Sequence, residues 1–172
     1  MEKAERKYLA HYLDAAFDMT AEETDYVRLG KDLEELSEEL NPDVSTVKNI
    51  LGENSVTHNG YEVSSEVGTY YYYYNDELSE KILELAMSRA TGDACKSTKV
   101  DVLLKPGATA DVAPTVVKAW REDVFVVPTS VGGDTSGVQI PFTLHNAGNR
   151  VSGTFNIDTK KFTPDGTSLE SL

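Results

Sequence analysis

Few side chains in this sequence are arranged for catalysis or metal binding. Its three histidines, His11, His58 and His145, are far apart, and none has the His-x-x-x-His spacing of a metal-binding helix. Cys95 is the single cysteine, which excludes an internal disulfide and a cysteine-rich zinc site. The sequence therefore predicts a protein that is not an enzyme and that uses no cofactor or metal. A metal-assisted hydrolase built on His58, His145 and Asp134 is the catalytic alternative.

Four glutamates lie close together in the first third of the chain, at Glu34, Glu35, Glu38 and Glu39. Acid–base catalysis would need two carboxyl groups in unlike environments within a cleft. A run of acidic residues is more typical of a solvated surface. We therefore interpret these four glutamates as a solvated acidic face.

Five consecutive tyrosines, Tyr70 to Tyr74, are the most unusual feature of the sequence. On an extended segment they would place three rings on one side and two on the other. Exposed tyrosine is common at protein interfaces because its side chain is rigid and amphipathic. We predict that Tyr71 and Tyr73 belong to a contact surface, with carbohydrate stacking as the alternative.

The overall charge argues against nucleic-acid binding. The 172 residues include 29 acidic and 16 basic side chains, a net charge of −13. Residues 1–91 contain 20 acids and 8 bases (−12), whereas residues 92–172 contain 9 and 8 (−1). No basic cluster is present that would neutralise phosphates. The absence of a long apolar run and of a signal-like N-terminus leads us to expect a cytoplasmic protein without a membrane-spanning segment.

The clearest helix is predicted over 76–91. Asn75 or Asp76 can cap it, its apolar residues fall on one stripe, and Gly92 offers a left-handed end. The periodicity then changes to two over 99–104, where Val100, Val102 and Leu104 alternate with Lys99, Asp101 and Leu103. Residues 115–120 and 123–127 are rich in Val, Phe and Trp, which favours strands.

A β-hairpin is predicted near the C-terminus. Residues 138–145 and 150–157 alternate between apolar and polar side chains and are separated by the turn-like sequence Asn146-Ala147-Gly148-Asn149. Pro141 cannot donate a hydrogen bond, so we expect it at a sheet edge or bulge. The resulting fold class is mainly β, a sandwich or barrel with one flanking helix.

The first third of the chain is ambiguous, because short apolar patterns do not separate helix from strand. Residues 8–17 and 29–40 could each line a short helix. We divide the chain into an N-terminal arm or first strand at 1–20, a single β-rich domain at 21–163 and a flexible C-terminal tail at 164–172.

The sequence as a whole resembles the tail tube proteins (major tail proteins) of tailed bacteriophages, which are related to type VI secretion tube proteins. In the first half, the resemblance is carried by residues 26–36, by Leu40-Asn41-Pro42 and by residues 48–53. The second half contributes the helix, then residues 138–144 and 149–155. No short piece is diagnostic, and the five-tyrosine run is not typical of the family.

The resemblance implies a structural protein of a phage or prophage tail. Family members form hexameric rings that stack into a tube through which DNA passes without specific binding. The implied partners are further copies of the chain, the tape measure protein, the tail terminator and the distal tail or baseplate proteins. Assembly would take place in the host cytoplasm, and the mature protein would belong to the virion tail. The resemblance also implies strand-like structure over 29–40.

Candidate site residues follow from this implied assembly. Glu34, Glu35, Glu38 and Glu39 are candidates for an acidic lumen, and Tyr71, Tyr73 and Pro141 for subunit interfaces. The N-terminal arm and the segment 49–74 would supply contacts between rings. The alternative function is a monomeric β-sandwich that binds a ligand such as carbohydrate through Tyr70–Tyr74 and Trp120.

Overall fold

The computed structural model describes residues 3–20 and 23–168, and for residues 166–168 it describes the backbone alone. Strands dominate, and one α-helix flanks them, so the predicted fold class is confirmed. The elements in chain order are η1 (Arg6–Tyr8), β1 (Leu9–Asp14), β2 (Tyr26–Leu29), β3 (Glu38–Glu39), β4 (Pro42–Lys48), β5 (Asn54–Tyr61), β6 (Ser64–Val67), α1 (Glu77–Ser88), η2 (Gly92–Cys95), β7 (Lys96–Lys105), β8 (Thr115–Pro128), β9 (Gly132–Asp134), β10 (Gly137–Gln139), β11 (Phe142–Asn156) and β12 (Lys161–Ser168).

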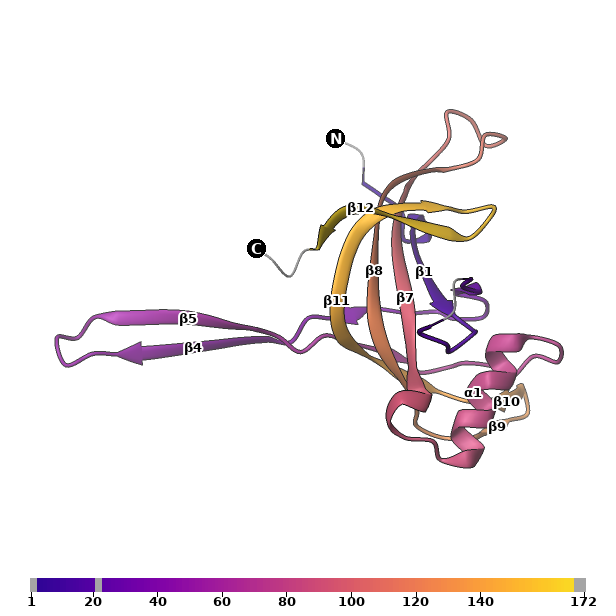
Figure 1. Cartoon of the computed structure of the whole chain (residues 1–172), viewed down its shortest axis with the longest axis horizontal. Helices are drawn as coiled ribbons and strands as arrows, with labels where there is room; N and C mark the ends of the chain where they lie inside the picture. Colours follow the sequence, from indigo (N-terminus) through magenta and orange to yellow (C-terminus); the bar gives the residue numbers. More distant parts are fainter. Residues whose placement is uncertain (1–2, 21–22, 169–172) are drawn as a thin grey trace.

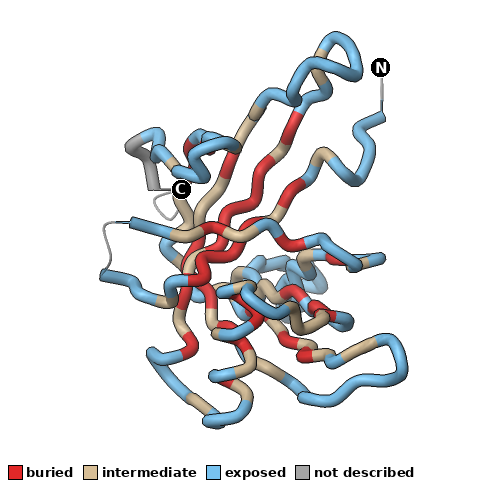
Figure 2. Tube along the Cα trace, turned by 90° about the vertical axis from the view of Figure 1, so that its right-hand side faces the viewer, coloured by how far each residue is buried: buried red, intermediate tan, exposed pale blue. Residues whose placement is uncertain are grey.

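One curled antiparallel sheet forms the body of the molecule (Figure 1). Its strands follow the order β2-β1-β7-β8-β11-β6-β3, and β12 pairs with the second half of β11. The long strands β7, β8 and β11 are its centre and contain many of its buried residues, the class coloured red in Figure 2. The hairpins β4–β5 and β9–β10 are separate from this sheet.

Two apolar clusters stabilise the body. The larger one joins α1 to the sheet, where Leu78 and Ile82 pack with Val126 and Phe142. The smaller cluster is centred on Tyr12, Val100, Val102 and Phe155, with the two aromatic rings 4.6 Å apart. The helix and the central strands therefore bury the apolar side that the sequence periodicity indicates.

The helix begins as predicted and ends earlier. Asp76 is its N-cap, and the Asp76 carboxylate accepts a hydrogen bond from the Ser79 amide at 2.9 Å. The helix ends at Ser88 because Arg89 is its C-cap, in the left-handed conformation (φ 52°). Gly92 also has a positive φ angle (65°), but it begins the 3-10 turn η2. The C-terminal boundary predicted at residue 91 was therefore a few residues too late.

The predicted C-terminal hairpin was wrong. Residues 142–156 form the single strand β11, which pairs along most of its length with the equally long β8. Gly148 and Asn149 do adopt positive φ angles (91° and 55°), but they produce bulges in the register with β8 and no chain reversal. Turn residues inside a strand thus bend it, which suits the curl of this sheet.

The tail predicted from residue 164 was also wrong up to Ser168. Lys161–Ser168 is strand β12, which is paired with β11, and residues 169–172 lie outside the described residues. At the other end of the chain, β1 lies between β2 and β7 inside the sheet. The helix considered over residues 8–17 is therefore replaced by a short 3-10 turn and a strand.

Residues 30–37, which we call the strap, connect the two edge strands β2 and β3. They are neither the helix nor the continuous strand that the sequence allowed. Leu36 of the strap is buried in the larger apolar cluster, and the Leu36 carbonyl accepts a hydrogen bond from Arg6 at 2.6 Å. The strap thus crosses one face of the sheet and is held against it.

Candidate assembly surfaces

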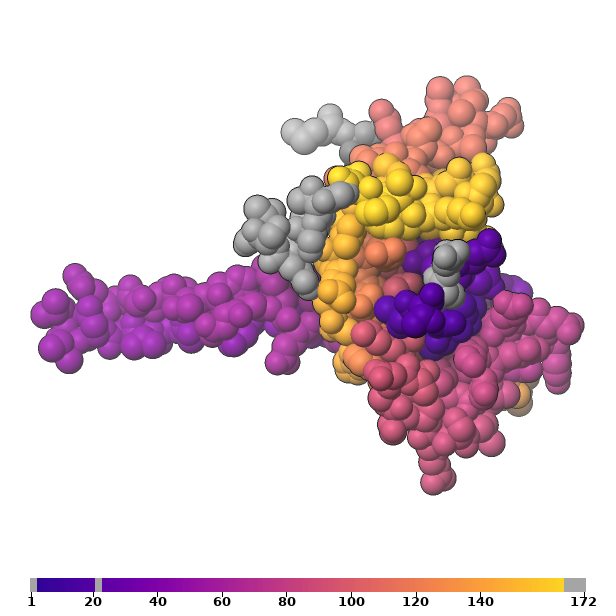
Figure 3. All heavy atoms as spheres, viewed as in Figure 1, coloured from indigo at the N-terminus to yellow at the C-terminus, as the bar shows by residue number. Residues whose placement is uncertain are grey.

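The hairpin β4–β5 projects from the body as a narrow arm (Figures 1 and 3). Its strands pair with each other from Pro42↔Tyr61 to Lys48↔Asn54, and with no other strand in the described residues. Every residue of the two strands except Gly60 is exposed. Several of these exposed residues are nevertheless apolar: Val44, Val47, Val56 and Tyr61, together with Ile50 and Leu51 at the tip.

The tyrosine run does not form a flat platform. Tyr70 is buried, with its ring edge-on to Phe142 at 5.2 Å, and burial raises the pKa of Tyr70 to about 12. Tyr72 and Tyr74 stack edge-to-face on each other at 5.4 Å, and Tyr74 is exposed. The five rings therefore do not alternate between two sides. Their exposure instead increases from the buried Tyr70 to the exposed Tyr74.

Tyr71 and Tyr73, predicted to be interface residues, both have partners within the chain. Tyr71 forms an isolated β-bridge to Gln139. The Tyr73 hydroxyl donates to Asp32 of the strap, and Lys31 lies 3.8 Å above the ring. The hydrogen bond to Asp32 raises the pKa of Tyr73 to about 12. Both side chains are half-buried, so they contribute to holding the strap as well as to the surface.

Pro141 lies directly before β11, which is an interior strand of the sheet. Its carbonyl accepts a hydrogen bond from the Thr129 amide at 2.8 Å, which closes the connection from β8 through β9–β10. Pro141 is half-buried. The sequence predicted that Pro141 marks a sheet edge. In the structure the proline instead ends a loop.

The four glutamates do not share one environment. Glu34, Glu35 and Glu39 are exposed and line a hollow of about 640 Å³. Further acidic residues, Asp32, Glu66 and Asp134, line the same hollow. Glu38 instead forms an ion pair with Lys99 of β7. The interpretation of all four as a solvated face is thus wrong for Glu38.

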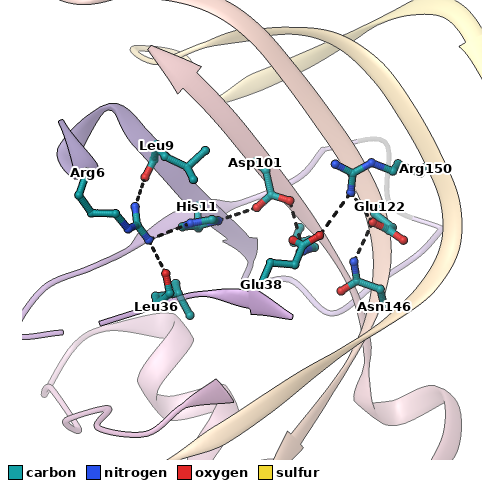
Figure 4. Close-up of polar contacts among 10 residues, drawn as sticks. Arg6, Leu9, His11, Leu36, Glu38, Asp101, Glu122, Asn146 and Arg150 are labelled. Atoms are coloured by element: carbon teal, nitrogen blue, oxygen red, sulfur yellow. Dashed lines mark hydrogen bonds and ion pairs between the residues drawn. The ribbon is translucent and has the colours of Figure 1, made fainter. Parts of the chain in front are cut away.

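Lys99 and Asp101 form the centre of a buried charge cluster. Figure 4 shows Asp101 between His11 and Glu38. Lys99 Nζ lies 3.2 Å from Asp101 and also contacts Glu38, while His11 Nδ1 donates to Asp101 at 2.6 Å. Burial acts to raise the pKa of Asp101, but the hydrogen bond from His11 and the charge of Lys99 lower it to about 2. The cluster thereby connects β1 and β7 to β3.

The cluster continues through Arg150 to the strands β8 and β11. The Arg150 guanidinium donates to Glu122 at 2.7 Å and lies 3.8 Å from Glu38, and Asn146 also donates to Glu122 at 2.8 Å. Burial nevertheless raises the pKa of Glu122. These hydrogen bonds and ion pairs link β8 and β11, which is typical of a structural network that fixes strand positions. Among the described residues, the Asn146 Oδ1 atom is buried without a hydrogen-bond partner.

The residues considered for metal-assisted catalysis are His58, His145 and Asp134. His58 is on the projecting hairpin, His145 on β11 and Asp134 on β9, so these residues come from separate elements. The described ranges contain no group of three or more His, Cys, Asp or Glu side chains placed to hold a metal ion. The Cys95 thiol is buried and donates to the Ala90 carbonyl at 3.2 Å.

Over the same described ranges, no helix has the length and apolar character that crossing a membrane requires. Comparison with protein-family models and with curated proteins finds no match to this chain.

Proposed function

We propose that this chain is a structural, self-assembling subunit of a phage or prophage tail tube. In this proposal, copies form stacked, hexameric rings, and DNA passes through the tube without being bound specifically. The observation that carries the proposal is the hairpin β4–β5, an arm with exposed apolar side chains that nothing in the described chain covers.

Elementary energetics explain why such an arm favours assembly. A two-stranded hairpin is at best marginally stable alone in water, because it has no packed face. Side chains such as Val47 and Val56, which are more than 60% exposed, gain free energy when a partner covers them. Several exposed apolar side chains gathered on one arm are typical of an interaction site. The arm is therefore best explained as a part that becomes buried between subunits.

The charge distribution supports passage of DNA. A conduit for a polyanion must repel phosphate so that the polymer slides without binding. Glu34, Glu35 and Glu39 are free to contribute to an acidic lumen, because they face the open hollow of about 640 Å³. Glu38 does not contribute to such a lumen, because its carboxylate forms an ion pair with Lys99.

The alternative function, a monomeric carbohydrate-binding module, has less support. Stacking on sugars requires exposed, coplanar rings, whereas Tyr70 is buried and Tyr72 meets Tyr74 at 85°. The hollow lined by Tyr71, Tyr72 and Tyr73 does not include Trp120, which lies beneath Arg150. The expected aromatic platform is therefore divided between two places.

The same proposal assigns the partners and the location. Further copies of the chain are the main partner, and tape measure, tail terminator and distal tail or baseplate proteins would meet the ends of the tube. Assembly would occur in the host bacterial cytoplasm and the product would reside in the virion tail.

Negative-stain electron microscopy over a concentration series, with light-scattering mass in parallel, tests the proposal. We expect rings or tubes of uniform width from the wild-type chain. A variant in which residues 43–60 are replaced by a short Gly-Ser turn should keep the folded body and lose the tubes. A wild-type protein that stays monomeric at every concentration, with tyrosine fluorescence that responds to sugars, would overturn the proposal in favour of the binding module.

A further inference from the structure

An apolar groove lies at the C-terminal end of α1, on the body of the molecule. It has a volume of about 420 Å³ and is bounded by the end of the helix on one side and by β8 on the other. Leu85, Phe125, Val127 and Pro128 are among its lining residues, and Val127 is 41% exposed. Arg89 is the charged residue at its rim. Its volume is that of a site for a small group of apolar atoms.

The tip of the projecting hairpin, residues 49–53, is the most exposed apolar point of the described chain. Ile50 is fully exposed and Leu51 is 78% exposed. Asn49 fixes the turn, because its side-chain oxygen accepts from the amides of Leu51 and Glu53 at 2.9 Å each. Two apolar side chains are thus held outward on a preorganised turn, which lowers the entropy lost on docking.

The tip and the groove are complementary in charge as well as polarity. Glu53 is the last residue of the tip, where its carboxylate accepts a hydrogen bond from Asn49, and Arg89 lies at the rim of the groove. Within the described ranges, neither side chain takes part in an ion pair of its own. An acidic residue beside two apolar ones therefore matches a basic residue beside an apolar groove.

The tip and the groove of one molecule cannot meet each other. Figure 1 shows the hairpin and α1 projecting from opposite sides of the body. A contact between the two features must therefore join two molecules. Because the two surfaces differ, the contact is heterologous, the type that continues from copy to copy into closed rings or filaments.

We propose that the tip residues Ile50 and Leu51 of one copy insert into the groove between α1 and β8 of a second copy, with Glu53 beside Arg89. This inference rests on the proposed function, since the partner is another subunit of the same assembly. It adds the identity of the two surfaces that meet.

Complementary single-sided variants test the contact. The tip variant carries Ile50→Asp and Leu51→Asp and keeps its groove, whereas the groove variant carries Val127→Asp and keeps its tip. Each should raise the concentration needed for assembly at least about tenfold, because burying one Leu or Val side chain is worth roughly that factor. In a mixture of the two, the intact tip of the groove variant can still bind the intact groove of the tip variant. Each pair of molecules therefore retains one contact. The mixture should give particles of twice the mass of either variant alone and no longer assemblies.

A matched control separates this contact from general effects of a new charge. Val117→Asp places the charge on β8, at a 56% exposed position outside both the groove and the hairpin. It should assemble like the wild type. As a second measurement, Glu53→Arg and Arg89→Glu should each weaken assembly, and the double variant should restore it.

The outcomes distinguish this contact from the proposed function. Wild-type tubes together with undiminished assembly of the Val127→Asp variant would overturn the contact and leave the tube proposal standing. A mixture that does not double in mass, with no rescue by the charge exchange, would also overturn it. A wild-type chain that never assembles would overturn both.

Discussion

Replacing Lys99 with methionine removes the cation at the centre of the buried cluster. The Lys99 side chain is 4% exposed, and its ammonium group contacts both Asp101 and Glu38. Breaking a buried ion pair from one side costs about 3–5 kcal/mol, because a carboxylate remains buried without its partner. We expect the lower end of this range, since Asp101 keeps His11 and Glu38 keeps Arg150. For a chain of this size, 3–5 kcal/mol lowers Tm by roughly 6–20 °C.

The pH dependence gives this prediction a sharper signature. The pKa of Asp101 is about 2 in the folded chain against an ordinary value of 3.8. A lowered pKa stabilises the fold above the unfolded value, so about 2 kcal/mol is present above pH 4 and is lost as the pH falls toward 2. Without Lys99 this pKa rises. The difference between wild type and variant should therefore be largest near pH 7 and shrink between pH 4 and pH 2.

Urea unfolding at pH 7 and pH 3 measures both effects, with Lys118→Met as the control. Lys118 pairs with Asp165 at 3.1 Å, but both side chains are about 40% exposed, so its loss should change the free energy of unfolding by less than about 1 kcal/mol. Equal losses in the two variants would refute the reasoning. A Lys99→Met penalty that does not change with pH would show that lost packing, and not charge, is responsible.

Four further substitutions test the body of the fold by urea unfolding. Leu78→Ala on the buried side of α1 should cost about 2–5 kcal/mol. Met87→Ala on the exposed side should stay within about 0.5 kcal/mol, and similar losses would contradict the packing of the helix. Asp76→Ala removes the N-cap and should cost about 1 kcal/mol; no loss would mean that another group caps the helix. Gly153→Ala would place a Cβ 2.2 Å from the Thr163 carbonyl oxygen. It should cost about 1–3 kcal/mol and speed amide exchange in β12, whereas unchanged exchange would argue against this close approach.

The sequence was sufficient for elements whose signal is local. The helix needed only a cap, an apolar stripe and residues that favour helix, and the structure places it at Glu77–Ser88. The strands at 115–120 and 123–127 were likewise recognised, although they are two parts of the single strand β8. Local patterns indicated the element type but not that Arg121 and Glu122 continue the strand between them.

Features set by distant partners could not be read from the sequence. Gly148 and Asn149 look like a turn, yet β8 pairs on both sides of them and keeps β11 a single strand. Lys99 and Asp101 occupy the polar side of an alternating strand, which indicates exposure. They are buried because Glu38 and the strap, from 60 residues earlier in the chain, cover that side. A lysine and an aspartate on the same side of one strand were the available hint of a charge cluster.

Ionic strength separates the two forces that act on an assembling subunit. The net charge of −13 makes copies repel one another, whereas the contact proposed for Ile50 and Leu51 is mainly apolar. Raising the salt from 0.1 M to 1 M shortens the screening length from about 10 Å to about 3 Å, which removes repulsion and leaves apolar burial intact. Assembly should therefore begin at lower protein concentration as salt rises, with light scattering as the readout and Val117→Asp responding like the wild type. The tip variant should respond little, because screening cannot restore a missing apolar contact. Dissolution of tubes by 1 M salt would instead mean that ion pairs between subunits outweigh the apolar contact.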